Sequence, residues 1–470
     1  MRRYIANGLC EYLKEFHGVW HMPGHKRKTG DFLRSKGENP NLSMIDTVLD
    51  SLHNIDVTEV PGLDDLHNPM GIIYESEKEL ASVYGTFASY YLVNGSTGGI
   101  LAAVASCVSQ KEKIIVADNC HKSVHNIACL LKLDACYVKS EALFENAGEA
   151  IKAICNDNPE AKAVVVTSPT YEGVFLDINI ISEIVHNAGM KLIVDEAHGA
   201  HLPFIKSLKK YSAIYNGADV VIQSLHKTLP SMTQTAILHI MDENLDADIR
   251  RYLSVFMSSS PSYIMLCDME RAIDIAQNYN YEAYMTKLMA TRKKLLKLKN
   301  ITLKEVHKNF DMEKLNSDPT RLVLSAKAPI TGAGFEKLLS DEYGIVCEMS
   351  GIDYVVLIST FFDSDEDFDY LYNSLKKIDD NYDNYIKKIK DIENETDQVY
   401  TFNANCSDKA YIKEMIGTLN ALEGEAAKDN IYVYPPGIYI VKKGEVYTRK
   451  KLDELILHVR QGRQLLGELN

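Results

Sequence analysis

The sequence predicts an α/β protein built on a mostly parallel β-sheet that helices cover on both faces. From about residue 90 to residue 240, short apolar runs alternate with helix-like segments. The runs are continuous and rich in Val and Ile, which is typical of strands buried on both faces, and their separations suit crossover helices. The expected strands are Tyr90–Val93, Lys113–Ala117, Ala163–Thr167, Lys191–Asp195, Asp219–Gln223 and Thr235–Ile240.

The pattern predicts smaller regions on either side of this sheet. Residues 1–85 are expected to form an irregular N-terminal segment that contributes to the active site. The large sheet domain is expected over 86–298, with its last part, from 244 onward, largely helical. A small α/β domain is expected over 299–380, and a C-terminal domain over 398–470 that closes with an amphipathic helix near Arg449–Leu466.

Composition narrows the class of protein. The chain has 470 residues and a net charge of −14, which disfavours a large nucleic-acid-binding surface. No apolar stretch approaches the ~18 residues that a membrane helix needs. The nine cysteines are scattered without a CxxC motif or zinc-ligand spacing, which predicts reduced thiols in a cytoplasmic protein.

Ligands of open α/β sheets bind at the carboxyl ends of the strands, so the residues after each run are the main candidates. The first run is followed by Asn94-Gly95-Ser96-Thr97, which leads into an Ala-rich helix. Small residues, hydroxyl groups and free backbone N–H groups at a helix start favour an anion site, such as one for a phosphate group. The alternative is an ordinary helix cap after a tight turn.

Two later strands end in charged residues. Asp195 closes an apolar strand, where an unpaired carboxylate would be costly, so it needs a partner such as a pyridinium nitrogen, a Lys, an Arg or a metal. Lys227 follows the next strand within Ser224-Leu225-His226-Lys227. A lysine in this place can bind phosphate, form a Schiff base, or simply reach solvent as a surface charge.

Two histidines, His121 and His125, follow the second run. Their spacing would allow two metal ligands on one helix face, but no third ligand or HExxH pattern accompanies them. An imidazole packed on an aromatic cofactor explains His121 better, and His125 is then a hydrogen-bonded core residue.

The order of these segments is more informative than any one of them. An anion-binding turn, a histidine, a strand-end aspartate and a Ser-x-His-Lys motif are the parts that an electron-sink cofactor requires. They would supply the phosphate anchor, the stacking partner, the carboxylate for the ring nitrogen and the imine-forming lysine. The sequence therefore predicts pyridoxal 5′-phosphate (PLP) as the cofactor, held by Lys227, and no metal.

With these motifs the chain resembles the bacterial Orn/Lys/Arg decarboxylases, which are fold type I PLP enzymes with the aspartate-aminotransferase fold. The resemblance runs through nearly the whole chain and matches the compact form that lacks an N-terminal wing domain. Its most specific piece is the lysine motif. The motifs that carry it are Pro23-Gly24-His25-Lys26, Asp56-Val57-Thr58-Glu59, Gly62–His67, Asn94–Thr97, Asn119–Ser123, Ser168–Gly173, Asp195–His198, Ser224–Lys227, Gln234-Thr235-Ala236, Ser259–Tyr263 and Tyr434–Gly437.

The resemblance implies a role for each candidate. Lys227 would form the Schiff base with PLP, Asp195 would pair with the pyridinium nitrogen, and His198 would lie near the ring. His121 would stack on the ring and act with Lys227 and Asp195 as the catalytic set. Ser259 would reach the phosphate of a neighbouring subunit, which implies a homodimer with shared active sites. The remaining cofactor-binding residues would hold the phosphate: Gly95, Ser96, Thr97, Ser224 and His226.

The implied reaction is decarboxylation of arginine, lysine or ornithine through an external aldimine, with arginine favoured by the similarity to the compact type. The alternatives are an aminotransferase or lyase that uses the same cofactor, and a catalytically silent regulatory relative. The acidic residues that could meet the distal cation of the substrate are Asp65, Glu172, Glu425 and Asp429. Glu425 stands where the family often has an arginine, and this departure bears on how the distal cation of the substrate is recognised.

Overall fold

The computed structural model describes residues 1–15, 51–304, 316–387, 409–429, 431–434, 438–441, 443–460, 464–467 and 469. The Pro23–Lys26 motif, Pro435–Gly437 and Cys406 lie outside these residues. The described chain forms two compact units. The first unit contains Met1–Val116, Asn126–Ser168 and Asp177–Tyr279, and the second contains Ala117–His125, Pro169–Leu176 and Asn280–Asn470.

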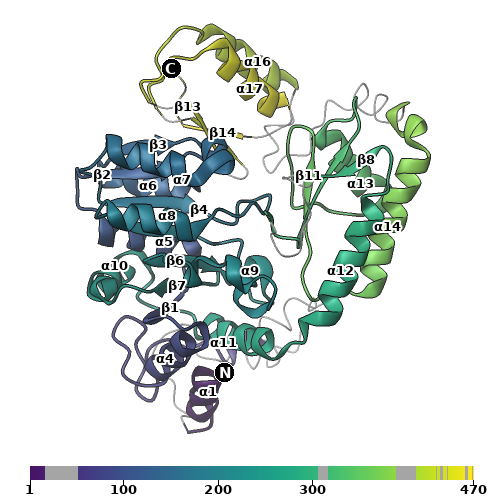
Figure 1. The fold of residues 1–470 in the computed structure, drawn as a ribbon. Helices are drawn as coiled ribbons and strands as arrows, with labels where there is room; N and C mark the ends of the chain where they lie inside the picture. The colour runs from purple at the N-terminus through teal and green to yellow at the C-terminus, as the bar shows by residue number, and fades with distance from the viewer. Residues whose placement is uncertain are drawn as a thin grey trace, which may run out of the picture. The chain divides into compact units, whose positions relative to one another are not determined.

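A seven-stranded sheet forms the core of the first unit, in the order β1-β7-β6-β5-β4-β2-β3 (Figure 1). The pairs β2–β4, β4–β5 and β5–β6 are parallel, whereas β7 runs antiparallel to both β6 and β1. The predicted fold class is therefore confirmed. The strands are β1 (Ala88–Leu92), β2 (Lys113–Ala117), β3 (Asp134–Val138), β4 (Ala163–Thr167), β5 (Lys191–Asp195), β6 (Val220–Ser224) and β7 (Ala236–Ile240).

Three predicted strands match β2, β4 and β5 residue for residue, and the other three differ from β1, β6 and β7 by one or two positions. The sequence did not predict β3. This edge strand begins with an exposed residue and buries only Val138, so it lacks the continuous Val/Ile run by which the central strands are recognised.

Helices connect and cover the strands of the first unit. Helix α5 packs against β1, β6 and β7, whereas α8 packs against β5 and α7 (Figure 1). The expected helical stretch after the sheet is confirmed by α10, α11 and the first helix of the second unit, α12. The helices up to α11 are α1 (Tyr4–Glu15), α4 (Ile72–Tyr84), α5 (Gly95–Cys107), α6 (Lys122–Leu130), α7 (Ser140–Asp157), α8 (Ile178–Asn187), α9 (Leu225–Thr228), α10 (Asp246–Phe256) and α11 (Tyr263–Asn278).

The second unit contains the expected smaller α/β regions. One is a four-stranded sheet in the order β10-β11-β9-β8, and the other is a three-stranded sheet in the order β13-β12-β14. The predicted closing helix ends earlier than expected, at Arg460, and β14 follows it. The strands are β8 (Ile301–Leu303), β9 (Arg321–Ala326), β10 (Met349–Ser350), β11 (Val355–Ile358), β12 (Ile431–Tyr434), β13 (Ile438–Val441) and β14 (Gln464–Leu466), and the helices are α12 (Tyr281–Leu295), α13 (Gly332–Tyr343), α14 (Asp365–Asp380), α16 (Lys409–Ala421) and α17 (Arg449–Arg460). Among the helices of the described residues, none combines the length and apolar character needed to cross a membrane.

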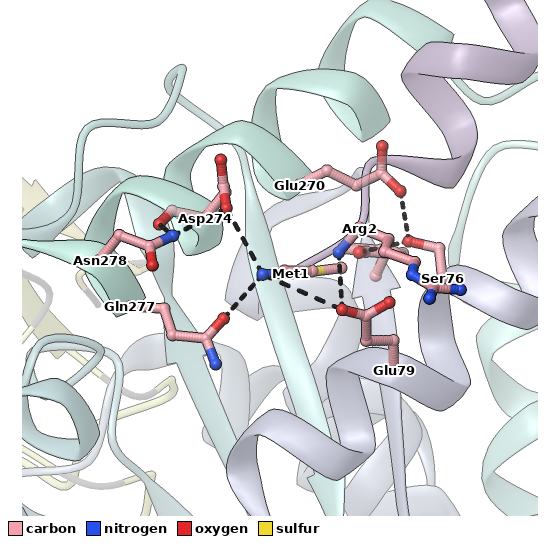
Figure 2. A network of polar contacts seen from close by, with 9 residues as sticks. Met1, Arg2, Ser76, Glu79, Glu270, Asp274, Gln277 and Asn278 are labelled. Atoms are coloured by element: carbon pink, nitrogen blue, oxygen red, sulfur yellow. Dashed lines mark hydrogen bonds and ion pairs between the residues drawn. The ribbon is translucent and has the colours of Figure 1, made fainter.

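The prediction of an irregular N-terminal segment was wrong at α1 and α4, which are regular helices, whereas residues 54–71 form turns and irregular structure. Buried Glu270 of α11 accepts the backbone N–H groups of Ile5 and Ala6, both at 3.1 Å, and so satisfies donors in the first turn of α1. The Ser76 hydroxyl of α4 donates to the same carboxylate at 2.6 Å (Figure 2). One side chain therefore joins three helices, through contacts that a local sequence pattern does not reveal.

The acidic loop before α4 is organised by Asp64. Its carboxylate accepts the N–H groups of Met70, Gly71 and Ile73 at 2.8–3.0 Å, so it caps the start of α4. Burial opposes the charge on Asp64, but these backbone donors prevail and lower the pKa of the carboxyl group. Asp64, which belongs to the Gly62–His67 motif, therefore serves as a helix cap.

A row of buried polar side chains crosses the sheet below the ends of β5 and β6. Gln223 donates from Nε2 to Glu196 Oε1 (2.6 Å), and its carbonyl oxygen faces His239 Nε2 (3.3 Å). The imidazole proton therefore belongs on Nε2, and Nδ1 accepts the Ser89 hydroxyl (2.8 Å). Since neighbouring side chains of a strand point to opposite faces, this row lies on the face opposite Asp195 and Ser224.

The buried row predicts a pH dependence of stability. Burial lowers the pKa of His239 to about 3, whereas an unfolded histidine titrates near ~6.5. The unfolded chain therefore binds a proton that the folded chain excludes. The stability from neutral His239 is complete above about pH 6.5 and is lost as the pH falls from there toward 3, by up to about 1.4 kcal/mol per pH unit.

Urea unfolding of the native protein and of His239→Gln between about pH 7.5 and about pH 5 isolates this slope, because all other groups are shared. We expect the stability advantage of the native protein over the variant to shrink as the pH falls. A constant difference across that range would show that His239 takes up a proton equally in both states.

Candidate functional site

The register of the sheet brings four chain segments to one edge. Asp195 at the end of β5 pairs with Thr167 on β4 and with Ile222 on β6. Ser224 at the end of β6 pairs with Ala236, which in turn pairs with Leu92 at the end of β1. Because β1, β4, β5 and β6 all run in the same direction, their carboxyl ends meet where ligands of such sheets bind.

The predicted anion-binding turn lies at this edge, directly after β1. Gly95 has a left-handed backbone, with φ +69°, and is the first residue of α5. The first N–H groups of a helix have no partner within the helix and carry its positive dipole end. The hydroxyl groups of half-buried Ser96 and exposed Thr97 belong to the same turn. The segment therefore offers N–H and O–H donors to an anion.

Ser224 supplies a second donor for an anion. It lies between β6 and α9 and is 0% exposed, and its hydroxyl oxygen has no hydrogen-bond partner among the residues that the structure describes. A buried hydroxyl group is normally hydrogen-bonded. The unmet hydroxyl of Ser224 fits a bound anion such as the phosphate of PLP.

Asp195 is the buried charge of this edge. It is 3% exposed, and within the described part of the chain its carboxylate accepts one hydrogen bond, from the Ala197 N–H at 3.1 Å. Burial raises the pKa of Asp195, while the charge of Lys227 and the Ala197 N–H act in the opposite direction. The carboxylate is therefore suited to a further cationic partner, and a protonated pyridine nitrogen is one.

Lys227 lies in the short helix α9, and its Nζ is 3.0 Å from Nε2 of buried His198. If the amine is charged, His198 must be neutral and accept through Nε2, with its proton on Nδ1. The contact therefore places the Lys227 amine beside an imidazole that can accept its proton. The Lys227 side chain is partly exposed, and its contact with His198 distinguishes it from a lysine that only reaches solvent.

The two remaining candidates of the first unit are partly exposed His226, beside Lys227 in sequence, and exposed Ser259. His226 contacts the Thr235 carbonyl through Nδ1 at 2.9 Å, which makes Nδ1 the protonated nitrogen. Ser259 is exposed in the loop between α10 and α11. Its neighbour Ser258 donates its N–H to Asn94 Oδ1 at 3.2 Å, so this loop lies beside the anion-binding turn of the same chain.

His121 belongs to the second unit and directly precedes α6. Its Nδ1 accepts the backbone N–H of Ser123 at 3.2 Å and contacts the Ser123 hydroxyl at 2.8 Å. These contacts fix the ring orientation and place the imidazole proton on Nε2.

The acidic candidates for substrate recognition lie in different surroundings. Exposed Asp65 accepts the His67 N–H, and Glu172 accepts the hydroxyl groups of Tyr354 (2.8 Å) and Thr170 (3.1 Å). Glu425 is exposed and Asp429 is half-buried. These surroundings do not single out one of them.

Sequence reasoning missed residues that hold these segments together. It quoted Asn94 and Gln234 within motifs but gave neither a role of its own. A signal was present for Gln234, because this polar residue follows the lysine motif at the entrance to a buried strand. The backbone conformation of Gln234 and the hydrogen-bond partner of its side chain, however, appear only in the structure.

Taken together, the edge fits PLP. It offers a helix start and an unmet buried hydroxyl for the phosphate, a buried carboxylate for the ring nitrogen, and a lysine beside a proton acceptor for the carbonyl carbon. Each of these groups belongs to the first unit, and each follows or ends a strand of the one sheet.

Comparison with known proteins agrees with this chemistry. The family model described as "Orn/Lys/Arg decarboxylase, major domain" matches residues 5–317. The arginine decarboxylase of Halalkalibacterium halodurans is 28% identical over 474 residues, covering 98% of this chain and 94% of the relative. The uncharacterized protein YaaO of Bacillus subtilis is 30% identical, covering 97% of this chain and 94% of that protein.

A solved structure shares the fold. The Francisella novicida lysine decarboxylase LdcF has a TM-score of 0.74 at 19% identity, over 98% of this chain and 77% of that one. The family model covers well over half of the chain, and the edge of the sheet carries the groups that PLP requires. The chain therefore belongs to the Orn/Lys/Arg decarboxylase family and is a PLP-dependent enzyme that decarboxylates a basic amino acid.

Proposed function

We propose that this enzyme decarboxylates arginine, at a site where Lys227 holds PLP. The observation that carries the proposal is the buried Asp195 carboxylate at the same sheet edge as the Lys227–His198 pair. The preference for arginine is supported by the relative from Halalkalibacterium halodurans, which is named arginine decarboxylase and matches nearly the whole chain.

Asp195 would bind the ring nitrogen and keep it protonated. Its carboxylate is almost completely buried, so the ionised form needs a cation close by. Bound PLP supplies an aromatic ring that accepts the electrons left when CO₂ departs from the substrate. A protonated ring nitrogen beside Asp195 favours this, because the carboxylate stabilises the proton at that atom.

Lys227 would supply the amine that bonds to PLP, and His198 would accept its proton. An amine bonds to a carbonyl carbon only when it is uncharged, so Lys227 Nζ must first lose a proton. His198 Nε2, at 3.0 Å, is positioned to accept it. The same pair could return a proton to the α-carbon after CO₂ leaves.

The phosphate would be bound by the turn after β1 together with the segment after β6. Gly95 would contribute backbone N–H donors, and Ser96, Thr97 and Ser224 would contribute hydroxyl groups. His226 would bind the phosphate from beside Ser224. His121 would stack on the ring, with its orientation fixed by Ser123.

We further propose a homodimer in which Ser259 of each subunit binds the phosphate in the other subunit. The exposure of Ser259 supports a role in an interface. The alternative is that Ser259 binds the phosphate in its own subunit. The contact of the neighbouring Ser258 with Asn94 of the same chain supports this alternative.

A product assay tests the substrate assignment. The purified enzyme is incubated with PLP and with arginine, lysine or ornithine, and CO₂ and the amine are both measured. We expect equal amounts of CO₂ and agmatine from arginine, with kcat/KM at least ~10-fold above the other two, which corresponds to about 1.4 kcal/mol of differential transition-state binding.

The control variants are Lys227→Ala, which should lose activity, and Lys206→Ala, an exposed lysine whose loss should leave activity unchanged. A preference for lysine or ornithine would contradict the arginine assignment. Pyruvate or ammonia released without CO₂ would contradict decarboxylation by this chain.

Subunit mixing tests the shared site. Lys227→Ala and Ser259→Glu should each be poorly active, the second because a carboxylate repels the phosphate. If Ser259 acts across the dimer, mixed dimers contain one site with both residues intact, and we expect activity to reappear after mixing. If mixing restores nothing although mass spectrometry detects mixed dimers, Ser259 serves its own subunit.

A further inference from the structure

Gln234 has a backbone conformation that is rare for its residue type. Its φ is +82°, in the left-handed region that favours glycine. Among the described residues other than glycine, Lys111 and Lys132 share a positive φ, and all three are exposed residues of turns that precede strands. Strained backbone of this kind persists where the surroundings hold it in place and is often found at functional sites.

The side chain of Gln234 makes a contact across the sheet edge. Its Nε2 donates to the Val93 carbonyl oxygen at 2.6 Å, between residues 141 positions apart in sequence. Val93 is 3% exposed and directly precedes Asn94, the residue before the anion-binding turn. The amide of Gln234 therefore satisfies a backbone acceptor at the start of that turn.

The backbone around Gln234 is tied to the lysine segment. The carbonyl of the next residue, Thr235, accepts the Leu225 N–H at 3.1 Å and contacts His226 Nδ1 at 2.9 Å. Both partners lie within two residues of Lys227. A displacement of Gln234 would therefore move the segment that carries the lysine.

Helix α11 also fixes the loop between Lys227 and Gln234. Asp268 of α11 accepts the Met232 N–H (2.6 Å) and the Ser231 hydroxyl (3.0 Å), and Thr235 Oγ1 donates within the same loop. These hydrogen bonds fix the conformation of the loop. Within the described part of the chain, the Gln234 side chain connects this loop to Val93, just before the turn that follows β1.

We propose that Gln234 is a positioning residue that sets the spacing between the lysine segment and the anion-binding turn. A cofactor held at both ends, by its phosphate and through a covalent bond to lysine, binds tightly only if both attachment points are at the correct separation. The inference rests on the proposed roles of Lys227 and of Gly95–Thr97. It adds that Gln234 touches no reacting atom and acts through these two segments.

The test is the affinity of the apoprotein for PLP, measured by titrating the visible absorbance of the bound cofactor. Gln234→Gly removes the amide but accepts the left-handed backbone without strain. Gln234→Asn keeps an amide and a residue that tolerates this backbone, but its side chain is one methylene shorter and cannot reach Val93 O in the same way. We expect both variants to bind PLP about 3- to 10-fold more weakly, the effect of one hydrogen bond.

Lys111→Gly is the matched control, because Lys111 is also an exposed turn residue with positive φ, but it precedes β2 and lies outside the loop that joins Lys227 to β7. Its PLP affinity should equal that of the native protein. Thermal melting of the apoproteins separates folding from positioning: we expect Gln234→Gly to melt close to the native temperature, because relief of the left-handed backbone strain offsets the lost hydrogen bond.

Native affinity in both Gln234 variants would overturn the inference while leaving the proposed function intact. Weaker binding in Gln234→Gly that is matched by Lys111→Gly would overturn it as well, since the loss would then reflect backbone flexibility in general. Failure of the proposed function has a different signature: the native protein itself would then bind no PLP at Lys227.

Discussion

The site depends on one buried charge, the carboxylate of Asp195 at the end of the central strand β5. A carboxylate that is 3% exposed raises the free energy of the folded protein unless a cation or several donors compensate it. The described chain provides the nearby Lys227 charge and one N–H donor, and burial still raises the pKa of the carboxyl group. We propose that the protonated ring nitrogen of PLP supplies the further cation that Asp195 requires.

The directions of the strands bring residues that are distant in sequence close to this carboxylate. Parallel strands β4, β5 and β6 end at the same edge. Because β7 is antiparallel to both β6 and β1, strand β1 runs in the same direction as β6 and ends there too. The opposite face carries the row of Glu196, Gln223, His239 and Ser89, whose hydrogen bonds link the ends of β5 and β6. At the ends of β5 and β6, Asp195 and Ser224 therefore lie on one face, and the hydrogen-bonded pair Glu196 and Gln223 lies on the other.

The sequence predicted most of the sheet and the identity of the candidate residues, because both depend on short-range patterns. Buried strands appear as Val/Ile runs, and the Ser224–Lys227 motif directly follows one of them. The edge strand β3 and the helix α1 were missed because their stability comes from tertiary contacts, such as those of Glu270 with Ile5, 265 positions away. The Gln234–Val93 hydrogen bond is another long-range contact, and nothing in the neighbouring sequence specifies it.

The central claim is that Lys227 is the residue that bonds to PLP, and covalent trapping tests it most directly. The PLP-loaded protein is reduced with borohydride, which makes the bond to the lysine permanent, and the labelled peptide is identified by mass spectrometry. We predict one pyridoxyl group per chain, on Lys227. A label on another lysine, or a loaded protein that carries none, would contradict the account.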